Sequence, residues 1–141
     1  RIGRILLATG RDATDVAIST TFGSSKLAYF EVITEQVGNG AARDAAERFG
    51  AVVLLKGLDT IVATPGAGIV VCDLGPPSLA TAGTGDVLTG VVASFLAKGM
   101  EAQTAAAAAA VAHGRAATLV EPQAGLVASD LLERLPAALG A

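Results

Sequence analysis

LATAGTGDVLTGVVASFLAKGM, which runs from Leu79 to Met100, is the stretch around which the rest of this chain is organised. It opens with small, flexible residues, reaches a single acid at Asp86, and continues with apolar residues at helical spacing. A glycine-rich turn that leads into a helix leaves backbone N–H groups without intrahelical partners, at the positive end of the helix dipole. The stretch therefore predicts an anion site, suited to a phosphate, at the start of a helix.

Two glycines and the acid give this turn its predicted chemistry. Gly83 and Gly85 let the backbone approach a phosphate closely, because no Cβ stands in the way. Asp86 lies where a bound phosphate would repel it, which suits an acid that takes a proton from a hydroxyl during phosphoryl transfer. The simpler alternative is an ordinary helix N-terminus, with Thr84 or Asp86 as its cap and the glycines as a turn.

The composition restricts the class of protein. The 141 residues fit one domain, and 52% hydrophobic against 16% charged residues indicate a compact core. A net charge of −3 and only 4% aromatic residues argue against nucleic-acid binding, which favours basic and aromatic surfaces. Cys72 is the single cysteine and no metal-ligand spacing is found, so we expect neither a disulfide nor a protein-bound metal. With no run of transmembrane length and no signal-peptide pattern, the expected compartment is the cytoplasm.

The middle of the chain predicts a buried strand whose end lies beside a ligand. Gly40–Phe49 is amphipathic at helical spacing, Gly50 follows as a helix stop, and Ala51–Leu55 is an unbroken apolar run. Such a run is typical of a strand covered on both faces, so helix and strand form the second half of a βαβ unit. Lys56 and Gly57 follow at the strand end, where α/β folds place ligands, and Lys56 carries a charge suited to a phosphate. The alternative is a solvated lysine.

Turn signals divide the segments on either side of this strand. Thr60–Ala63 and Gly68–Val71 flank a Pro-Gly pair, which predicts a hairpin. Asp73–Ser78 is expected to be a loop, because its two prolines lack N–H donors. The N-terminal part is less regular, and its expected elements are a strand over Arg4–Ala8, a loop over Ser19–Ser25 and a strand over Lys26–Thr34.

Two further helices are expected after the glycine-rich stretch. Glu101–Leu119 is rich in alanine, and its lone His113 is expected to be a buried, hydrogen-bonded histidine to which we assign no chemistry. Leu131–Leu139 is expected to be a helix with Ser129 or Asp130 as its cap, bent or shortened by Pro136. Its expected buried face consists of Leu131, Leu132, Leu135 and Leu139.

Four segments occur in an order that resembles one family: VVLLKGLDTIVATP, PSLATAGTGDVLTGVVASFLAKG, VAHGRAA and GLVASDLLERLP. In this combination the chain resembles the C-terminal portion of the ribokinase-like NAD(P)H-hydrate dehydratases, over roughly residues 40–139. The resemblance implies an α/β fold, a partial ribokinase-like three-layer α/β/α sandwich, with a central, mostly parallel sheet, a hairpin and a C-terminal helical group. Residues 1–141 would then be a single, incomplete domain in which residues 1–39 match the family poorly.

The resemblance also implies an activity. A hydro-lyase of this family dehydrates the 6-hydroxylated cofactors NADHX and NADPHX to NADH and NADPH, with ADP or ATP as co-substrate and Mg²⁺ on its phosphates. As in bacterial members, ADP use with release of AMP and phosphate is expected. Asp86 would face the hydrated nicotinamide as the catalytic residue and activate its hydroxyl for attack on the terminal phosphate. The implied nucleotide contacts are Lys56, Gly57, Leu58, Asp59 and Thr60 of the KGLDT segment, and Gly83, Thr84 and Gly85 of the turn.

The resemblance also implies partners, and two alternative functions stay open. The family implies a homo-oligomer and an NAD(P)HX epimerase, fused or separate, with no nucleic acid and no membrane as partner. One alternative is a small-molecule kinase of the same superfamily, such as a hydroxyethylthiazole kinase, although the ASDLL ending favours the dehydratase. The other is a non-catalytic nucleotide-binding fragment, because residues 1–39 contain neither the family's glycine-rich substrate segment nor its Thr-Pro-His motif.

Overall fold

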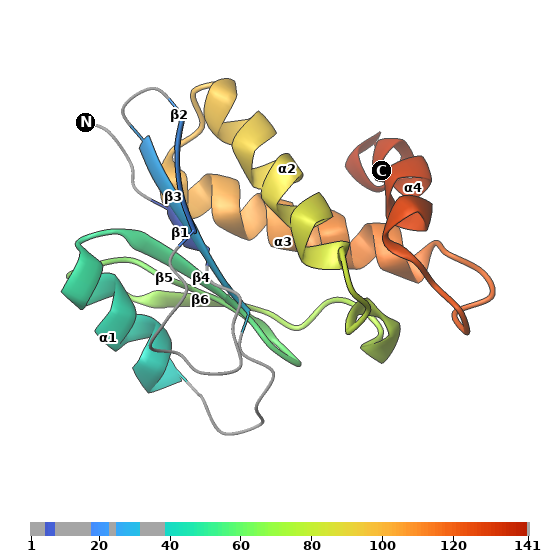
Figure 1. The fold of residues 1–141 in the computed structure, drawn as a ribbon, viewed down its shortest axis with the longest axis horizontal. Coiled ribbons are helices and arrows are strands. Elements are labelled where there is room, and N and C mark those ends of the chain that lie inside the picture. The colour runs from blue at the N-terminus through green and yellow to red at the C-terminus, as the bar shows by residue number, and fades with distance from the viewer. Residues whose placement is uncertain (1–4, 8–17, 23–24, 32–38, 141) are drawn as a thin grey trace.

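The computed structural model describes residues 5–7, 18–22, 25–31 and 39–140, with side chains from residue 40 onward. Its described strands form one sheet in the order β2-β3-β1-β4-β5-β6 (Figure 1). The strands are β1 Ile5–Leu7, β2 Ile18–Phe22, β3 Ser25–Glu31, β4 Val52–Lys56, β5 Thr60–Ala63 and β6 Ile69–Cys72.

The sheet is mixed. β1 pairs in parallel with β3 and β4, and β3 pairs in parallel with β4, whereas β2–β3, β4–β5 and β5–β6 are antiparallel. The prediction of a mostly parallel sheet is therefore wrong for the described strands. The reason is the length of one connection: only residues 57–59 join β4 to β5, and a parallel pairing would need a crossover of about a dozen residues or more. The predicted β5–β6 hairpin is confirmed.

The N-terminal expectations are met in part. The strands predicted over Arg4–Ala8 and Lys26–Thr34 correspond to β1 and β3, and residues 4, 8 and 32–34 lie outside the described residues. The loop predicted over Ser19–Ser25 is wrong, because β2 occupies most of it and pairs antiparallel with β3. Thr20 and Thr21 are β-branched, and pairing with a neighbouring strand outweighs the small polar character of the segment.

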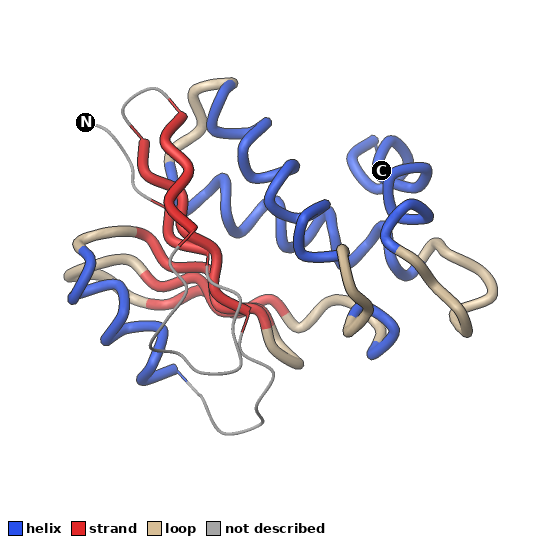
Figure 2. The backbone as a smooth tube through the Cα atoms, viewed as in Figure 1, coloured by secondary structure: helices blue, strands red, loops and turns tan. Residues whose placement is uncertain are grey.

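Helices cover both faces of the sheet (Figures 1 and 2). α1 (Asn39–Phe49) lies on one face, and α2 (Thr84–Ala97) and α3 (Ala102–Thr118) lie on the other, while α4 (Ala128–Gly140) packs on α3. α1 connects the parallel strands β3 and β4, which confirms the predicted βαβ unit. Among the described helices, none has both the length and the apolarity that crossing a bilayer requires.

The alternation of side chains along β4 explains the three layers. Every residue of β4 is buried, which confirms the prediction of a strand covered on both faces. Val53 and Leu55 pack with Ala42 and Ala46 of α1. Leu54 lies between them and points the opposite way, because successive residues of a strand face opposite sides. It packs in the apolar cluster of α2 and α3. The core is thus two apolar layers, one on each side of the sheet.

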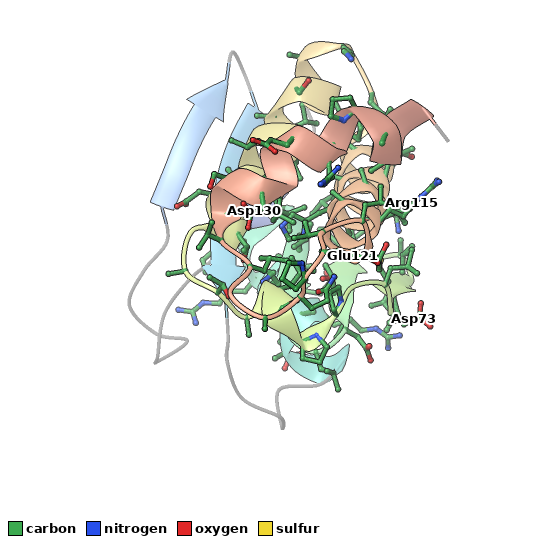
Figure 3. The ribbon with its side chains drawn as sticks, turned by 90° about the vertical axis from the view of Figure 1, so that its right-hand side faces the viewer. Asp73, Arg115, Glu121 and Asp130 are labelled. Atoms are coloured by element: carbon green, nitrogen blue, oxygen red, sulfur yellow. The ribbon has the colours of Figure 1, made fainter. Side chains whose placement is uncertain are left out.

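The C-terminal helices follow the predicted spans, but the start of α4 differs from prediction. α3 matches Glu101–Leu119, and Glu101 caps it by accepting a hydrogen bond from the Thr104 N–H at 3.0 Å. α4 begins at Ala128, so Asp130 lies inside the first turn, where its carboxylate accepts from the Val127 N–H at 2.9 Å. The predicted cap at Ser129 or Asp130 is therefore wrong, although the Asp130 contact is half of a capping box. Figure 3 shows Asp130 at the beginning of α4.

Pro136 and the leucines of α4 also differ from prediction. The helix continues through Pro136 to Gly140, so shortening at the proline is wrong. Leu131 is fully buried, but Leu132 is 56% exposed and Leu139 is 53% exposed. The helical period accounts for this, because each of the two exposed leucines lies about 100° around the helix from a buried neighbour, Leu131 or Ala138.

Candidate functional site

The KGLDT segment forms a tight reversal between two strands. Lys56 ends β4 and pairs across the antiparallel ladder with Thr60, the first residue of β5. Between them the Gly57 N–H donates to the Asp59 carbonyl oxygen at 3.1 Å, and Leu58 at the tip is 90% exposed. Gly57 and Asp59 are exposed as well. The segment therefore offers a row of exposed backbone and side chains at the end of β4.

The glycine-rich turn enters α2 without a side-chain cap. Gly83 is the N-cap residue, in the left-handed conformation at φ 85°, and no side-chain hydrogen bond caps the helix. A Cβ on Gly83 would lie 3.1 Å from the Ala128 Cβ, so a side chain at this position meets both backbone strain and the start of α4. The alternative in which Thr84 or Asp86 caps an ordinary helix is thus wrong, since both lie within the first turn.

One N–H group at this helix start has no acceptor among the described residues. The Thr84 N–H donates to Thr81 O at 3.3 Å, and the N–H groups of Asp86 and Val87 both donate to Gly83 O, at 3.1 and 3.3 Å. Of the first four N–H groups of α2, only that of Gly85 has no acceptor within the described part of the chain. A helix N-terminus with an unpaired N–H at a glycine is suited to an anion.

A buried lysine connects the end of β4 to this turn. Lys56 is only 6% exposed, and its Nζ donates to the Leu79 carbonyl oxygen at 2.9 Å and to Thr84 Oγ1 at 3.4 Å. Thr84 is fully buried, and its hydroxyl lies 2.8 Å from Leu79 O and 2.9 Å from Thr81 O. The alternative of a solvated Lys56 is therefore wrong. The structure brings the KGLDT segment and the glycine-rich turn together through this side chain.

His113 approaches the same turn from α3. Its Nε2 lies 2.8 Å from the Thr84 carbonyl oxygen, and its side chain is 3% exposed. Burial and then the nearby Lys56 charge lower the pKa of His113 to about 4, while the hydrogen bond to Thr84 opposes the shift. At neutral pH the imidazole is therefore neutral, and Nε2 carries the proton, because a carbonyl can only accept. The prediction of a buried, hydrogen-bonded histidine is confirmed.

Asp86 presents its carboxylate to solvent beside the unpaired Gly85 N–H. The residue is exposed in the first turn of α2, and within the described part of the chain its carboxylate makes no hydrogen bond or ion pair. The helix dipole stabilises a carboxylate at this position. An unpaired N–H donor and a carboxylate therefore lie on neighbouring residues, an arrangement suited to phosphoryl transfer to a hydroxyl.

A family profile described as NAD(P)H-hydrate dehydratase matches residues 24–137. The chain belongs to the NAD(P)H-hydrate dehydratase family. Over 99 residues it is 46% identical to the ADP-dependent (S)-NAD(P)H-hydrate dehydratase of Neisseria meningitidis serogroup B, covering 70% of this chain and 33% of the relative. Over another 99 residues it is 43% identical to the bifunctional NAD(P)H-hydrate repair enzyme of Salinibacter ruber, covering 68% of this chain and 18% of the relative. The chain thus spans a third or less of the length of these two curated relatives.

Solved structures place the fold in the same family. The ADP/ATP-dependent NAD(P)H-hydrate dehydratase of Bacillus subtilis, co-crystallised with ATP and Mg²⁺, matches with a TM-score of 0.67 at 30% identity, over 72% of this chain and 38% of that one. A ribokinase-like superfamily protein of Enterococcus faecalis matches in fold with a TM-score of 0.61 at 22% identity, over 81% of this chain and 46% of that one. The expected ribokinase-like fold of a NAD(P)H-hydrate dehydratase is confirmed.

Sequence reasoning missed the contacts that His113 and the Leu79 carbonyl make at the glycine-rich turn. His113 was assigned no chemistry, and the Leu79 carbonyl, which accepts from Lys56, belongs to a residue with no polar side chain. The only sequence signal for the histidine was its place as a single polar ring in an alanine-rich helix. Such a helix lets neighbouring elements approach its backbone closely, but the pattern does not say which element will do so.

Proposed function

We propose that this chain carries the nucleotide-binding and catalytic part of an enzyme that dehydrates NADHX and NADPHX to NADH and NADPH, with ADP as co-substrate. The observation that carries the proposal is the pairing of an unpaired Gly85 N–H with the exposed Asp86 carboxylate at the start of α2. Family membership and the ADP-dependent relative support the choice of reaction.

Two segments, the glycine-rich turn and the exposed KGLDT reversal, receive the nucleotide in this proposal. The phosphates lie at the glycine-rich turn, where Gly83, Thr84 and Gly85 bring the backbone close and the helix dipole favours negative charge. The rest of the nucleotide lies along the KGLDT reversal, against the exposed residues Gly57, Leu58 and Asp59, with Thr60 at its far end. Lys56 supplies positive charge from beneath the turn, through its contact with Thr84.

Asp86 performs the chemical step. Its carboxylate takes the proton from the hydroxyl of the hydrated nicotinamide, and that oxygen attacks the terminal phosphorus of ADP, with AMP as leaving group. The C–O bond of the resulting phosphate ester then breaks, a proton leaves the neighbouring ring carbon, and the dihydropyridine is restored with release of phosphate. The Gly85 N–H donates to an oxygen of the transferred group as its charge develops.

Magnesium fits this site through the nucleotide. The described residues contain no group of three or more His, Cys, Asp or Glu side chains that would hold a metal. Mg²⁺ commonly binds through substrate phosphates and one or two carboxylates, keeping several waters, and the exposed Asp86 and the ADP phosphates match that habit. When bound, it neutralises phosphate charge beside Asp86.

The partners in this proposal are those of a cofactor-repair enzyme. The substrate is NADHX or NADPHX, and an NAD(P)HX epimerase works with the dehydratase, either fused to it or separate. The bifunctional repair enzyme of Salinibacter ruber, which is similar to this chain, supports the fused form. We further propose that the chain acts as a homo-oligomer and as part of one longer dehydratase domain.

The test is a coupled incubation with NADHX and ADP, in which the absorbance of the reduced nicotinamide is followed. The proposal expects that absorbance to return with one AMP and one phosphate per NADH, and not to return without nucleotide. An arm with ATP in place of ADP compares the two co-substrates. A small-molecule kinase would instead leave the absorbance unchanged and give a product that keeps the phosphate, whereas ADP binding without any conversion would indicate a nucleotide-binding fragment.

A further inference from the structure

We propose that His113 is a positioning residue of the anion site: it acts through the Thr84 carbonyl to orient and polarise the peptide group whose N–H, that of Gly85, meets the phosphate. The inference rests on the function proposed above and adds a role for a residue of α3. Lys56 assists from β4 by tying both ends of the glycine-rich turn.

One peptide group connects His113 to the unpaired N–H. The Thr84 carbonyl and the Gly85 N–H belong to the same peptide, and in a trans peptide these two groups point in opposite directions. His113 Nε2 donates to that carbonyl at 2.8 Å from the buried side. The N–H at the other end of the same peptide plane is therefore directed away from His113, and it is the one left without an acceptor among the described residues.

The His113 hydrogen bond also polarises the peptide group between Thr84 and Gly85. A donor that bonds to a carbonyl oxygen draws electron density through the amide, and the N–H of that amide becomes a stronger donor. The effect is greatest away from water, and both Thr84 and His113 are buried. A carbonyl has two lone pairs, so the His113 bond adds to the helical bond that the same oxygen can accept. His113 thus strengthens the donor that an incoming phosphate oxygen would use.

Lys56 holds both ends of the turn, and the residues between those ends reach the surface, while Gly85 itself is buried in the first turn of α2. The flanking residues Leu79 and Thr84 are buried, and both accept hydrogen bonds from Lys56, at the Leu79 carbonyl and the Thr84 hydroxyl. The residues between them, Ala80, Thr81, Ala82 and Gly83, are exposed or half-buried. Burial and the nearby Lys56 charge lower the pKa of His113, so its imidazole stays neutral. It therefore acts as a directed N–H donor, while the lysine supplies the positive charge.

Paired substitutions of His113 test this role, because Gln and Asn offer their amide nitrogen at different places. His113→Gln puts an N–H donor near the Nε2 position, whereas the shorter side chain of His113→Asn puts it near Nδ1, out of reach of Thr84. Val92→Ala, a truncation of a fully buried residue in α2, is the control for lost packing. The readouts are the dissociation constant for ADP and the ¹⁵N–¹H amide signal of Gly85, each measured on the whole chain alongside its melting temperature.

The expected results separate the donor from the packing. We expect His113→Asn to weaken ADP binding by about threefold to tenfold, the range that one hydrogen bond supplies, and to move the Gly85 signal in the free protein. His113→Gln and Val92→Ala should stay close to the unsubstituted chain in both readouts. Equal ADP affinity and an unmoved Gly85 signal in His113→Asn would overturn the inference, as would equal losses in the Asn and Gln variants or in Val92→Ala. If the unsubstituted chain binds no ADP, the proposed function itself fails.

Discussion

A Cβ atom on Gly114 of α3 would lie 2.5 Å from the backbone carbonyl oxygen of Leu74, a distance that no real Cβ keeps. The loop that follows β6 therefore rests directly on the backbone of α3. Gly75, the next residue of that loop, is also close, because its Cβ would lie 3.5 Å from the Gly114 Cα. Since His113 is the neighbour of Gly114, this contact helps to set the distance between α3 and the glycine-rich turn.

Gly114→Ala should destabilise the protein. The added methyl meets backbone atoms of Leu74, which cannot rotate away, so the loop or the helix must shift, at a cost of about 1–3 kcal/mol in the free energy of unfolding. Gly90→Ala is the matched control, because a Cβ there meets nothing within 4 Å and alanine favours the helix by roughly 1 kcal/mol. Urea denaturation of the two variants checks the prediction, and a Gly114→Ala protein as stable as the parent contradicts the close contact.

The stability of the fold should fall with pH in a window set by His113. Burial and the Lys56 charge lower its pKa from 6.5 to about 4 in the folded state, so between these values the unfolded chain binds a proton that the folded chain does not. The contribution of His113 to the free energy of unfolding is therefore at its maximum above pH 6.5. It decreases as the pH falls toward 4, by up to about 3 kcal/mol.

His113→Gln removes this titration and gives the comparison for that window. Denaturant titrations of both proteins between pH 7 and pH 4 should show a steeper loss for the parent than for the variant. Parallel curves would mean that His113 keeps an ordinary pKa in the folded protein, contrary to its burial.

Lys56→Met should weaken ADP binding by about tenfold or more. The methionine keeps the length and apolar stem of the side chain but removes the charge and the hydrogen bonds to Leu79 O and Thr84 Oγ1. The anion site then loses its positive charge, and the turn loses the contact that ties its two ends. Lys98→Met, at an exposed lysine after α2, is the control. Titration of labelled ADP measures both, and equal affinities would remove Lys56 from the site.

The elements that sequence predicted best are those whose signals are local. The unbroken apolar run of β4 and the Pro-Gly pair between β5 and β6 each specify their own structure. The sequence indicates only a binding segment in KGLDT, although the same five residues also reverse the chain, and this is one reason why the sheet is mixed. β2 depends on pairing with β3, and such pairing outweighs local composition.

The candidate site likewise has a part that is local in sequence and a part that depends on contacts between distant residues. The helix N-terminus at Gly83 and Gly85, where we propose the anion site, is visible in sequence because it follows from one continuous stretch. The hydrogen bond from His113 to Thr84 joins residues 29 positions apart, and the contact of Lys56 with Leu79 joins residues 23 positions apart. Such contacts depend on how α3 and β4 pack beneath the turn, which no spacing along the chain encodes. The burial of Lys56 follows from that packing as well.

Gly85→Val should abolish nucleotide-dependent activity, and its melting temperature measures what a side chain costs at this buried position. In the proposed function a phosphate oxygen approaches the Gly85 N–H, and a valine side chain beside that N–H would restrict the approach. Gly90→Val, later in the same helix, has open space around its Cβ and controls for the lower helix propensity of valine. Turnover of NADHX with ADP and the melting temperature are measured for both. Full turnover in Gly85→Val would show that the phosphate does not approach this residue.

Asp86→Asn should reduce turnover without weakening ADP binding. A carboxylate and a polyphosphate repel each other, so Asp86 opposes nucleotide binding slightly, and its benefit comes only when the substrate hydroxyl loses a proton. The amide keeps the shape and removes the basicity, and general-base catalysis typically contributes about a hundredfold to ten-thousandfold in rate. We therefore expect kcat to fall within that range while the dissociation constant for ADP is unchanged or slightly lower.

Asp44→Asn, at an exposed acid on α1, is the matched control and should be silent in both measurements. Because Asp86 caps no N–H in α2, its replacement should leave the melting temperature nearly unchanged, so a loss of rate reports chemistry. An Asp86→Asn enzyme with parental kcat would exclude the carboxylate from the reaction.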